Sequence, residues 1–136
     1  MALIIDAGPL YAYVDRDDAH HRACLDLLET HRGPLIVPEL VITEVTYLLG
    51  TRIGVDAEVR FISDLANGNL IPEPVAPADW LRIAELVAMY RDLPLGTVDA
   101  SVVAAAERLD VTEIATLDRR HFNVVRPFNG AFALLP

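Results

Sequence analysis

The sequence predicts an α/β fold in which a mostly parallel central sheet of four to five strands is flanked by helices. Short apolar runs of strand length alternate along the chain with longer segments in which apolar residues recur at helical spacing. Such alternation is typical of parallel sheets that are covered by helices. The length of 136 residues fits one domain, residues 1–136.

Five apolar runs are short enough to be strands. The first is followed by Gly8-Pro9, which predicts a break in the chain. Pro72 and Pro74 lie in the third run and cannot donate to a sheet ladder, so this strand is expected at an edge of the sheet. The expected strands are residues 2–6, 35–37, 70–75, 113–116 and, in the tail, 131–134.

Six segments show helical spacing. Gly54 is expected to end one of these helices. Asp79 and Thr97 are expected to cap the N-termini of two others, because their side-chain oxygens can accept from free backbone N–H groups. The expected helical segments are residues 10–14, 20–31, 39–53, 56–65, 77–90 and 97–109.

Composition places the chain among packed cytoplasmic proteins. Hydrophobic residues make up 53% of it, and the only cysteine, Cys24, cannot form an internal disulfide. The apolar start ends at Asp6, too early for a signal peptide or a membrane span. The net charge of −9 argues against a nucleic-acid partner unless the excess acid is gathered at one place.

Two acidic residues stand on helices where apolar residues are expected. Glu44 has Leu40, Val41 and Leu48 three or four residues away, so it is expected on the inward face. Asp99 begins the apolar stripe of segment 97–109. A buried carboxylate without a partner costs several kcal/mol, so both predict a positive group nearby.

Two other acidic residues end strands, Asp6 after the first and Asp118 after the fourth. The carboxyl ends of parallel strands share one edge of a sheet. Asp6, Glu44, Asp99 and Asp118 can therefore meet in one pocket. The chain contains no lysine, and carboxylate oxygens are suitable ligands for Mg²⁺ or Mn²⁺. These four residues are thus candidate metal ligands and catalytic residues.

Each acidic residue also has a purely structural interpretation. Asp99 can act on the dipole of its helix, Asp6 can form a turn, and Asp118 can cap a turn at Arg119. Only the conjunction of all four favours a metal site.

Four segments in this order resemble the PIN domain, and more narrowly the VapC-type toxins of bacterial type II toxin–antitoxin systems. They are residues 3–6 (LIID), 39–44 (ELVITE), 93–100 (LPLGTVDA) and 115–122 (ATLDRRHF). The resemblance implies a Mg²⁺-dependent endoribonuclease with Asp6, Glu44, Asp99 and Asp118 at the metal. It also implies a homodimer and a small cognate antitoxin that occludes the pocket.

The family often has Ser or Thr directly after the first aspartate, but Ala7-Gly8 follow Asp6 here. Thr116 is the candidate to support the metal ligands instead. Arg119, Arg120 and His121 are candidate contacts for RNA phosphates. Two alternatives stay open: a non-catalytic protein-binding module on the same fold, and a nuclease that acts on another nucleic acid.

Overall fold

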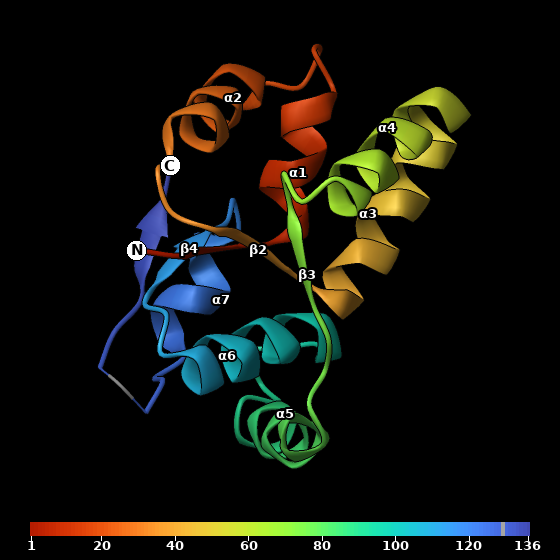
Figure 1. Cartoon of the computed structure of the whole chain (residues 1–136). Helices are drawn as coiled ribbons and strands as arrows, with labels where there is room; N and C mark the ends of the chain where they lie inside the picture. Colours follow the sequence, from red (N-terminus) through yellow and green to blue (C-terminus); the bar gives the residue numbers. More distant parts are fainter. Residues whose placement is uncertain (129) are drawn as a thin grey trace.

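The computed structural model describes residues 1–128 and 130–136. Its centre is a five-stranded sheet with the order β3-β2-β1-β4-β5, and every strand pair in it is parallel. Figure 1 shows this sheet between two groups of helices. The strands are β1 (Leu3–Ile5), β2 (Leu35–Pro38), β3 (Ile71–Glu73), β4 (Glu113–Ala115) and β5 (Ala133–Leu135).

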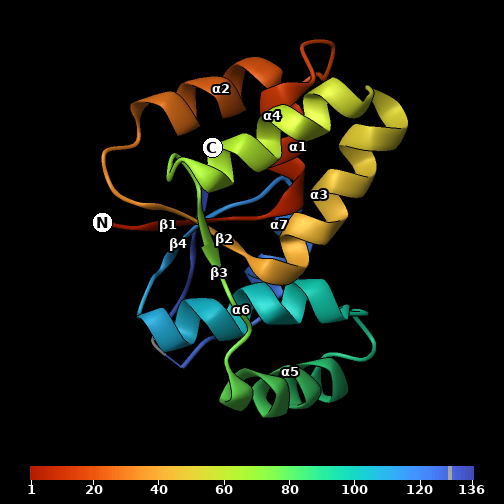
Figure 2. The same ribbon diagram turned by 45° about the vertical axis from the view of Figure 1, so that its right-hand side comes forward.

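Helices cover both faces of the sheet. Figure 2 shows α1, α2 and α4 on one side and α6 on the other, with α5 packed outside α6. Within the described residues, none of the helices is long and apolar enough to cross a membrane. The helices are α1 (Ala7–Val14), α2 (His21–Thr30), α3 (Glu39–Arg52), α4 (Val55–Ala66), α5 (Pro77–Met89), α6 (Thr97–Leu109) and α7 (Arg119–Val124).

The predicted fold class is confirmed, and the sheet is parallel throughout. The strand that carries Pro72 lies at an edge, as its missing N–H requires. The tail forms the other edge strand, at Ala133–Leu135 and not at 131–134. Gly54, with φ 143°, separates α3 from α4 in a conformation that favours glycine.

Several predicted helix ends are wrong. Gly8-Pro9 does not form a loop, because α1 begins at Ala7 and includes both residues. A proline is tolerated in the first turn of a helix, where its missing N–H would have no helical partner. Asp79 is not an N-cap: the cap is Ala76, and Asp79 reaches back to its backbone N–H at 2.9 Å. Thr97 is the first residue of α6, after Gly96 as the cap.

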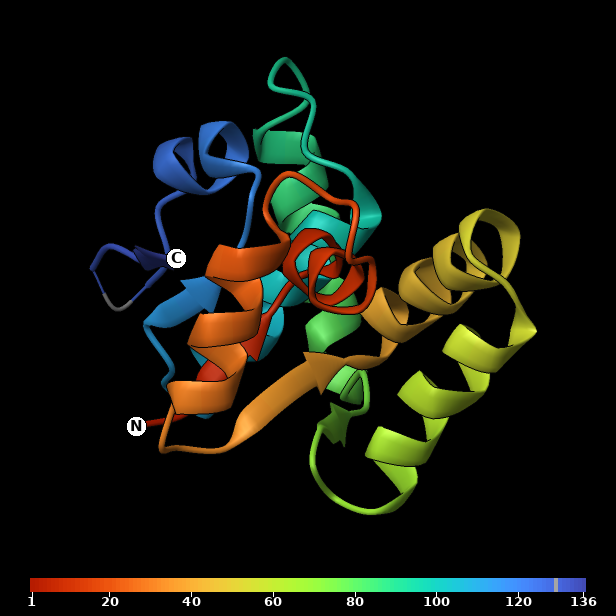
Figure 3. The ribbon, with the colours of Figure 1, turned by 90° about the horizontal axis from the view of Figure 1, so that it is seen from above.

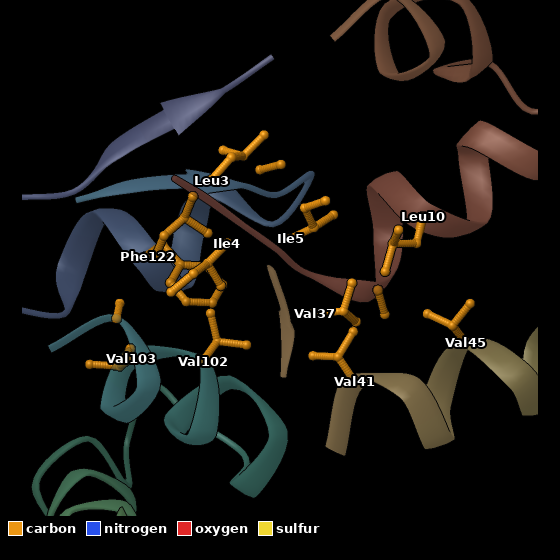
Figure 4. Close-up of a cluster of buried hydrophobic side chains, with 14 of the residues drawn as sticks. Leu3, Ile4, Ile5, Leu10, Val37, Val41, Val45, Val102, Val103 and Phe122 are labelled. Carbon is orange, nitrogen blue, oxygen red and sulfur yellow. The ribbon is translucent and has the colours of Figure 1, made fainter. Parts of the chain in front are cut away.

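The core lies on both faces of the central strand. Figure 4 shows Ile4 beside Phe122 and Val102 on the side of α6, while Leu3 points to the opposite side. All these side chains are buried. The free Cys24 is also fully buried, as expected for a cysteine that contributes to packing.

Arg108 of α6 forms ion pairs with Asp79 of α5 and with Glu73 of β3. Asp79, which is buried, accepts from Nε of Arg108 at 3.1 Å and from the N–H of Ala76 at 2.9 Å. The same guanidinium contacts Glu73 at 3.1 Å. We expect Asp79→Ala to lower the free energy of unfolding by about 2 kcal/mol, since it leaves Arg108 and the Ala76 N–H without this partner. Urea unfolding measures the effect.

The matched control is Glu85→Ala on the same helix, because Glu85 is half exposed and contacts Arg82 only at 3.4 Å. Its change should stay within about 0.5 kcal/mol. An equal effect of the two substitutions would contradict the role given to Asp79.

Candidate functional site

The strand order creates a crevice at one edge of the sheet. From β1 the chain first adds β2 and β3 on one side, and then returns to add β4 and β5 on the other. The connections leave neighbouring strands β1 and β4 in opposite directions, and ligands bind at such points in open α/β sheets. Asp6 follows β1 and Asp118 follows shortly after β4. The prediction that strand ends bring these two aspartates to one edge is met.

The pocket at this edge has a volume of about 500 Å³. Helices deliver its other two acidic side chains: Asp99 lies in the first turn of α6 and Glu44 in the second turn of α3. Figure 3 shows how α3 runs from the end of β2 along α4, away from the sheet. The residues that line the pocket are Asp6, Ala7, Gly8, Glu44, Asp99, Leu117 and Asp118.

Asp6 is the most enclosed of the four acidic residues, with 7% of its surface exposed. Its carboxylate accepts from the N–H of Ala7 at 2.8 Å and from the hydroxyl of Thr116 at 3.0 Å. Burial nevertheless raises the pKa of Asp6 to about 6, and the charges of Asp99 and Glu44 act in the same direction. The site therefore holds this carboxylate at an energetic cost that a cation would relieve.

Glu44 is placed differently from the prediction. It is exposed and not on the buried face of α3, which consists of Val41, Val45 and Leu49. Leu40 and Leu48 are only half-buried, so the apolar stripe is narrower than their spacing suggested. Glu44 lies beside this stripe and lines the pocket. Partial desolvation and the charge of Asp99 raise its pKa.

Asp99 and Asp118 share one basic neighbour, His121. Its Nδ1 lies 3.0 Å from Oδ2 of Asp99 and 2.8 Å from Oδ2 of Asp118. Burial raises the pKa of Asp99, and the contact with His121 opposes this. His121, which the sequence predicts as a contact for RNA phosphates, lies in α7, a helix that was not predicted.

Asp118 combines its two predicted roles. It is the N-cap of α7, accepting from the N–H of His121 at 3.3 Å, and it lines the pocket. Asp6 likewise caps α1 while it lines the pocket. Asp6 and Asp118 can therefore cap a helix and contribute a carboxylate to the pocket at the same time.

Comparison with known proteins identifies the family. The chain matches the PIN domain over residues 3–126. It is 36% identical over 135 residues to ribonuclease VapC26 of Mycobacterium tuberculosis (strain ATCC 25618 / H37Rv), covering 98% of this chain and 100% of the relative. The chain belongs to the PIN domain family. The resemblance to the PIN domain and to VapC-type proteins that the sequence predicts is thereby confirmed.

Several solved structures share the fold of this chain. VapC20 of Mycobacterium tuberculosis, a sarcin-ricin loop cleaving toxin, superimposes with a TM-score of 0.77 at 19% identity, over 82% of this chain and 86% of VapC20. The DNA-bound VapBC2 of Rickettsia felis gives a TM-score of 0.73 at 11% identity over 100% of both chains. The DNA-bound VapBC of Salmonella typhimurium gives 0.71 at 12% identity over 98% of both chains.

The donor set of this PIN domain fits a divalent cation. Asp99, Asp118 and His121 each offer a ligand atom, and these atoms lie within 4.8 Å of one another. The carboxylates of Asp6 and Glu44 line the same pocket. Among the residues that line it, all within the described part of the chain, there is no arginine to balance this charge. Oxygen ligands in excess over one nitrogen suit Mg²⁺ or Mn²⁺.

The two arginines of α7 lie at the surface of the PIN domain. Arg119 and Arg120 are exposed, and the guanidinium of Arg119 contacts the carbonyl oxygen of Pro136. Both belong to the first turn of the helix that carries His121. Their contact with RNA phosphates stays a prediction.

Thr116 connects two of the acidic residues. It is fully buried, donates to Asp6 at 3.0 Å and accepts from the N–H of Asp118 at 3.0 Å. We expect Thr116→Val to lower the free energy of unfolding by about 2 kcal/mol, because Asp6 loses a buried hydrogen bond and Asp118 a partly buried one, without a change of volume. Urea unfolding of the metal-free protein measures it, and Thr116→Ser, which keeps the hydroxyl, should recover most of the loss. Equal stability of the Val and Ser variants would contradict this interpretation.

Proposed function

We propose that this PIN domain is a Mg²⁺-dependent endoribonuclease, with Mn²⁺ able to substitute, and that it acts as the toxin of a toxin–antitoxin pair. The observation that carries the proposal is the meeting of Asp6, Glu44, Asp99 and Asp118 in one pocket of a chain that is 36% identical, over nearly its full length, to a protein named as a ribonuclease. The placement of the pocket at the strand ends also supports it.

The residues have distinct proposed roles. Asp6 and Asp99 bind the cation directly, Glu44 binds it or orients the attacking water, and Asp118 acts beside them at the same ion or at a second one. Thr116 fixes the carboxylate of Asp6 by its hydrogen bond. A bound divalent cation supplies neutralisation of the scissile phosphate and a lowered pKa of water.

The acidic excess of the chain is consistent with this function, because part of it lies in the pocket and would be offset by the cation. Phosphates of RNA would then meet the exposed guanidiniums of Arg119 and Arg120 near the pocket. The 136 residues would act as one nuclease domain.

The proposed partners are a second copy of the chain and a small antitoxin. Two of the structures with the same fold are VapBC complexes, which supports an antitoxin partner. An antitoxin would occlude the acidic pocket and so keep RNA out. The proposed place of action is the cytoplasm, where a protein with one free, buried cysteine needs no oxidising compartment.

The test is cleavage of a pool of structured RNAs by purified protein without antitoxin. We expect cutting with Mg²⁺, none with EDTA, and none by the Asp6→Ala and Glu44→Gln variants. Glu44 is exposed, so its variant tests the chemistry without disturbing the core. Parallel reactions on single-stranded and double-stranded DNA separate an RNA target from another nucleic acid. Metal binding without cleavage of any nucleic acid would favour the protein-binding module.

A further inference from the structure

His121 lies beside the pocket, against two of its carboxylates, in a position that none of the proposed roles explains. It is 19% exposed in its side chain and lies between two carboxylates from different parts of the chain. Asp99 comes from the start of α6, whereas Asp118 and His121 come from the loop after β4 and from α7. An RNA phosphate contact, the role predicted for His121, needs a side chain directed toward solvent and not toward two carboxylates.

One atom makes both contacts. Nδ1 is 3.0 Å from Oδ2 of Asp99 and 2.8 Å from Oδ2 of Asp118. Ligand atoms on neighbouring corners of an octahedron around an ion at about 2.1 Å lie about 3.0 Å apart. Without an ion these are hydrogen-bond distances, and the same spacing fits ligands that share one ion.

The structure also holds these atoms in place. The other oxygen of Asp118, Oδ1, accepts from the backbone N–H of His121 at 3.3 Å, and the N–H of Asp118 donates to Thr116 at 3.0 Å. Asp118 is the N-cap of α7 and His121 lies three residues later in its first turn, so their side chains can meet. Such restraint keeps a ligand set ready for an ion before the ion arrives.

We infer that Nδ1 of His121 is a metal ligand together with Asp99 and Asp118, and that this nitrogen shifts the preference of the site from Mg²⁺ toward Mn²⁺. Mg²⁺ favours all-oxygen sites, whereas imidazole nitrogen is bound better by first-row transition metals. A neutral imidazole can make both kinds of contact. Without an ion its hydrogen is on Nδ1, which donates to the carboxylates; with an ion the hydrogen is on Nε2, which leaves Nδ1 free to bind the metal. The inference rests on the proposed function, because it assumes a metal in this pocket.

The competing role is that of a positioning residue, in which His121 only orients the two carboxylates from behind. Removal of a positioning residue would weaken the binding of both metals alike. Removal of a nitrogen ligand weakens Mn²⁺ binding more than Mg²⁺ binding. The ratio of the two affinities thus separates the two roles, and it does not depend on RNA cleavage.

The experiment is titration calorimetry with Mn²⁺ and with Mg²⁺ on the wild type, His121→Ala and His121→Gln, combined with pulsed electron paramagnetic resonance of the Mn²⁺-loaded protein. We expect a nitrogen coupling to Mn²⁺ in the wild type that both variants lose. We also expect the Mn²⁺ affinity to fall by at least about tenfold, against less than about threefold for Mg²⁺. His20→Ala is the matched control, because His20 is exposed and lies outside the pocket, and it should leave both affinities unchanged.

The outcomes separate this inference from the proposed function. Mn²⁺ bound without nitrogen coupling, or an equal loss of both metals in the His121 variants, overturns the role of His121 while the metal-dependent function stands. Binding of neither metal to the wild type overturns both. Circular dichroism of each variant shows that it is folded, so a loss of affinity can be attributed to the ligand.

Discussion

Asp99→Asn is expected to lower RNA cleavage at saturating Mg²⁺ by at least about 1,000-fold, equivalent to about 4 kcal/mol of transition-state stabilisation. Asparagine keeps the size of the side chain in the first turn of α6 but removes the charge that would hold the cation. The oxygen concerned lies 3.0 Å from His121, at the point where α6 meets α7. Initial rates on a defined RNA substrate measure the effect.

The same substitution should also change the response of the fold to metal. A ligand that binds only the native state raises the melting temperature, so millimolar Mn²⁺ should stabilise the wild type and should stabilise Asp99→Asn much less. Asp92→Asn is the matched control, since Asp92 is exposed, lies before α6 and does not line the pocket. Cleavage by Asp99→Asn within tenfold of the wild type would remove Asp99 from the proposed machinery.

The strands were predictable from the sequence because each is an apolar run bounded by turn residues, and β1 and β4 lie in the centre where both faces are buried. Their order was not predictable. The crevice between β1 and β4 depends on which strands are neighbours, and an apolar run in the sequence does not indicate which strand it will pair with. The expectation that Asp6 and Asp118 share an edge needed only parallel strands.

Helix α7 escaped prediction because its six residues, RRHFNV, are too few to show a helical period. The available signal was the pair Asp118 and Phe122: an N-cap residue followed, four residues later, by an apolar side chain that is buried against Ile4. Without the helix, the position of His121 beside Asp99 and Asp118 could not be predicted. Its contact with Asp99 joins residues 22 positions apart and follows only from the packing of α7 near α6.

Glu44 shows the limit of helical periodicity. The spacing from Leu40, Val41 and Leu48 predicts an inward position, but a stripe defined by apolar residues includes some that are only half-buried. The rim of such a stripe is where a side chain can reach both a pocket and solvent. Helical spacing of about 100° per residue cannot separate the rim from the centre. Glu44 therefore lines the predicted pocket from the rim of the stripe and not from its centre.

Asp6→Asn is expected to stabilise the metal-free protein at neutral pH, by about 2 kcal/mol. The folded state raises the pKa of Asp6 from 3.8 to about 6, so between these values the folded protein binds the proton more tightly than the unfolded chain. The contribution of Asp6 to stability is therefore most favourable below pH 3.8 and falls as the pH rises to about 6. Above that pH the charged carboxylate lowers the free energy of unfolding of the wild type by about 3 kcal/mol. The variant avoids this cost but loses the hydrogen bond to Thr116, which is worth about 1 kcal/mol.

The measurement is urea unfolding in EDTA at pH 4 and pH 7.5. The gain from Asp6→Asn should appear at pH 7.5 and vanish or change sign at pH 4, where the folded wild type already carries the proton. Saturating Mn²⁺ at pH 7.5 should reverse the order, because only the wild type then gains the free energy of binding through Asp6. Asp92→Asn, with its exposed side chain, should change stability by less than about 0.5 kcal/mol at either pH. A gain that is the same at both pH values would mean that burial of the charge at Asp6 is not its source, and that the carboxylate is held in the pocket without the cost that a cation would relieve.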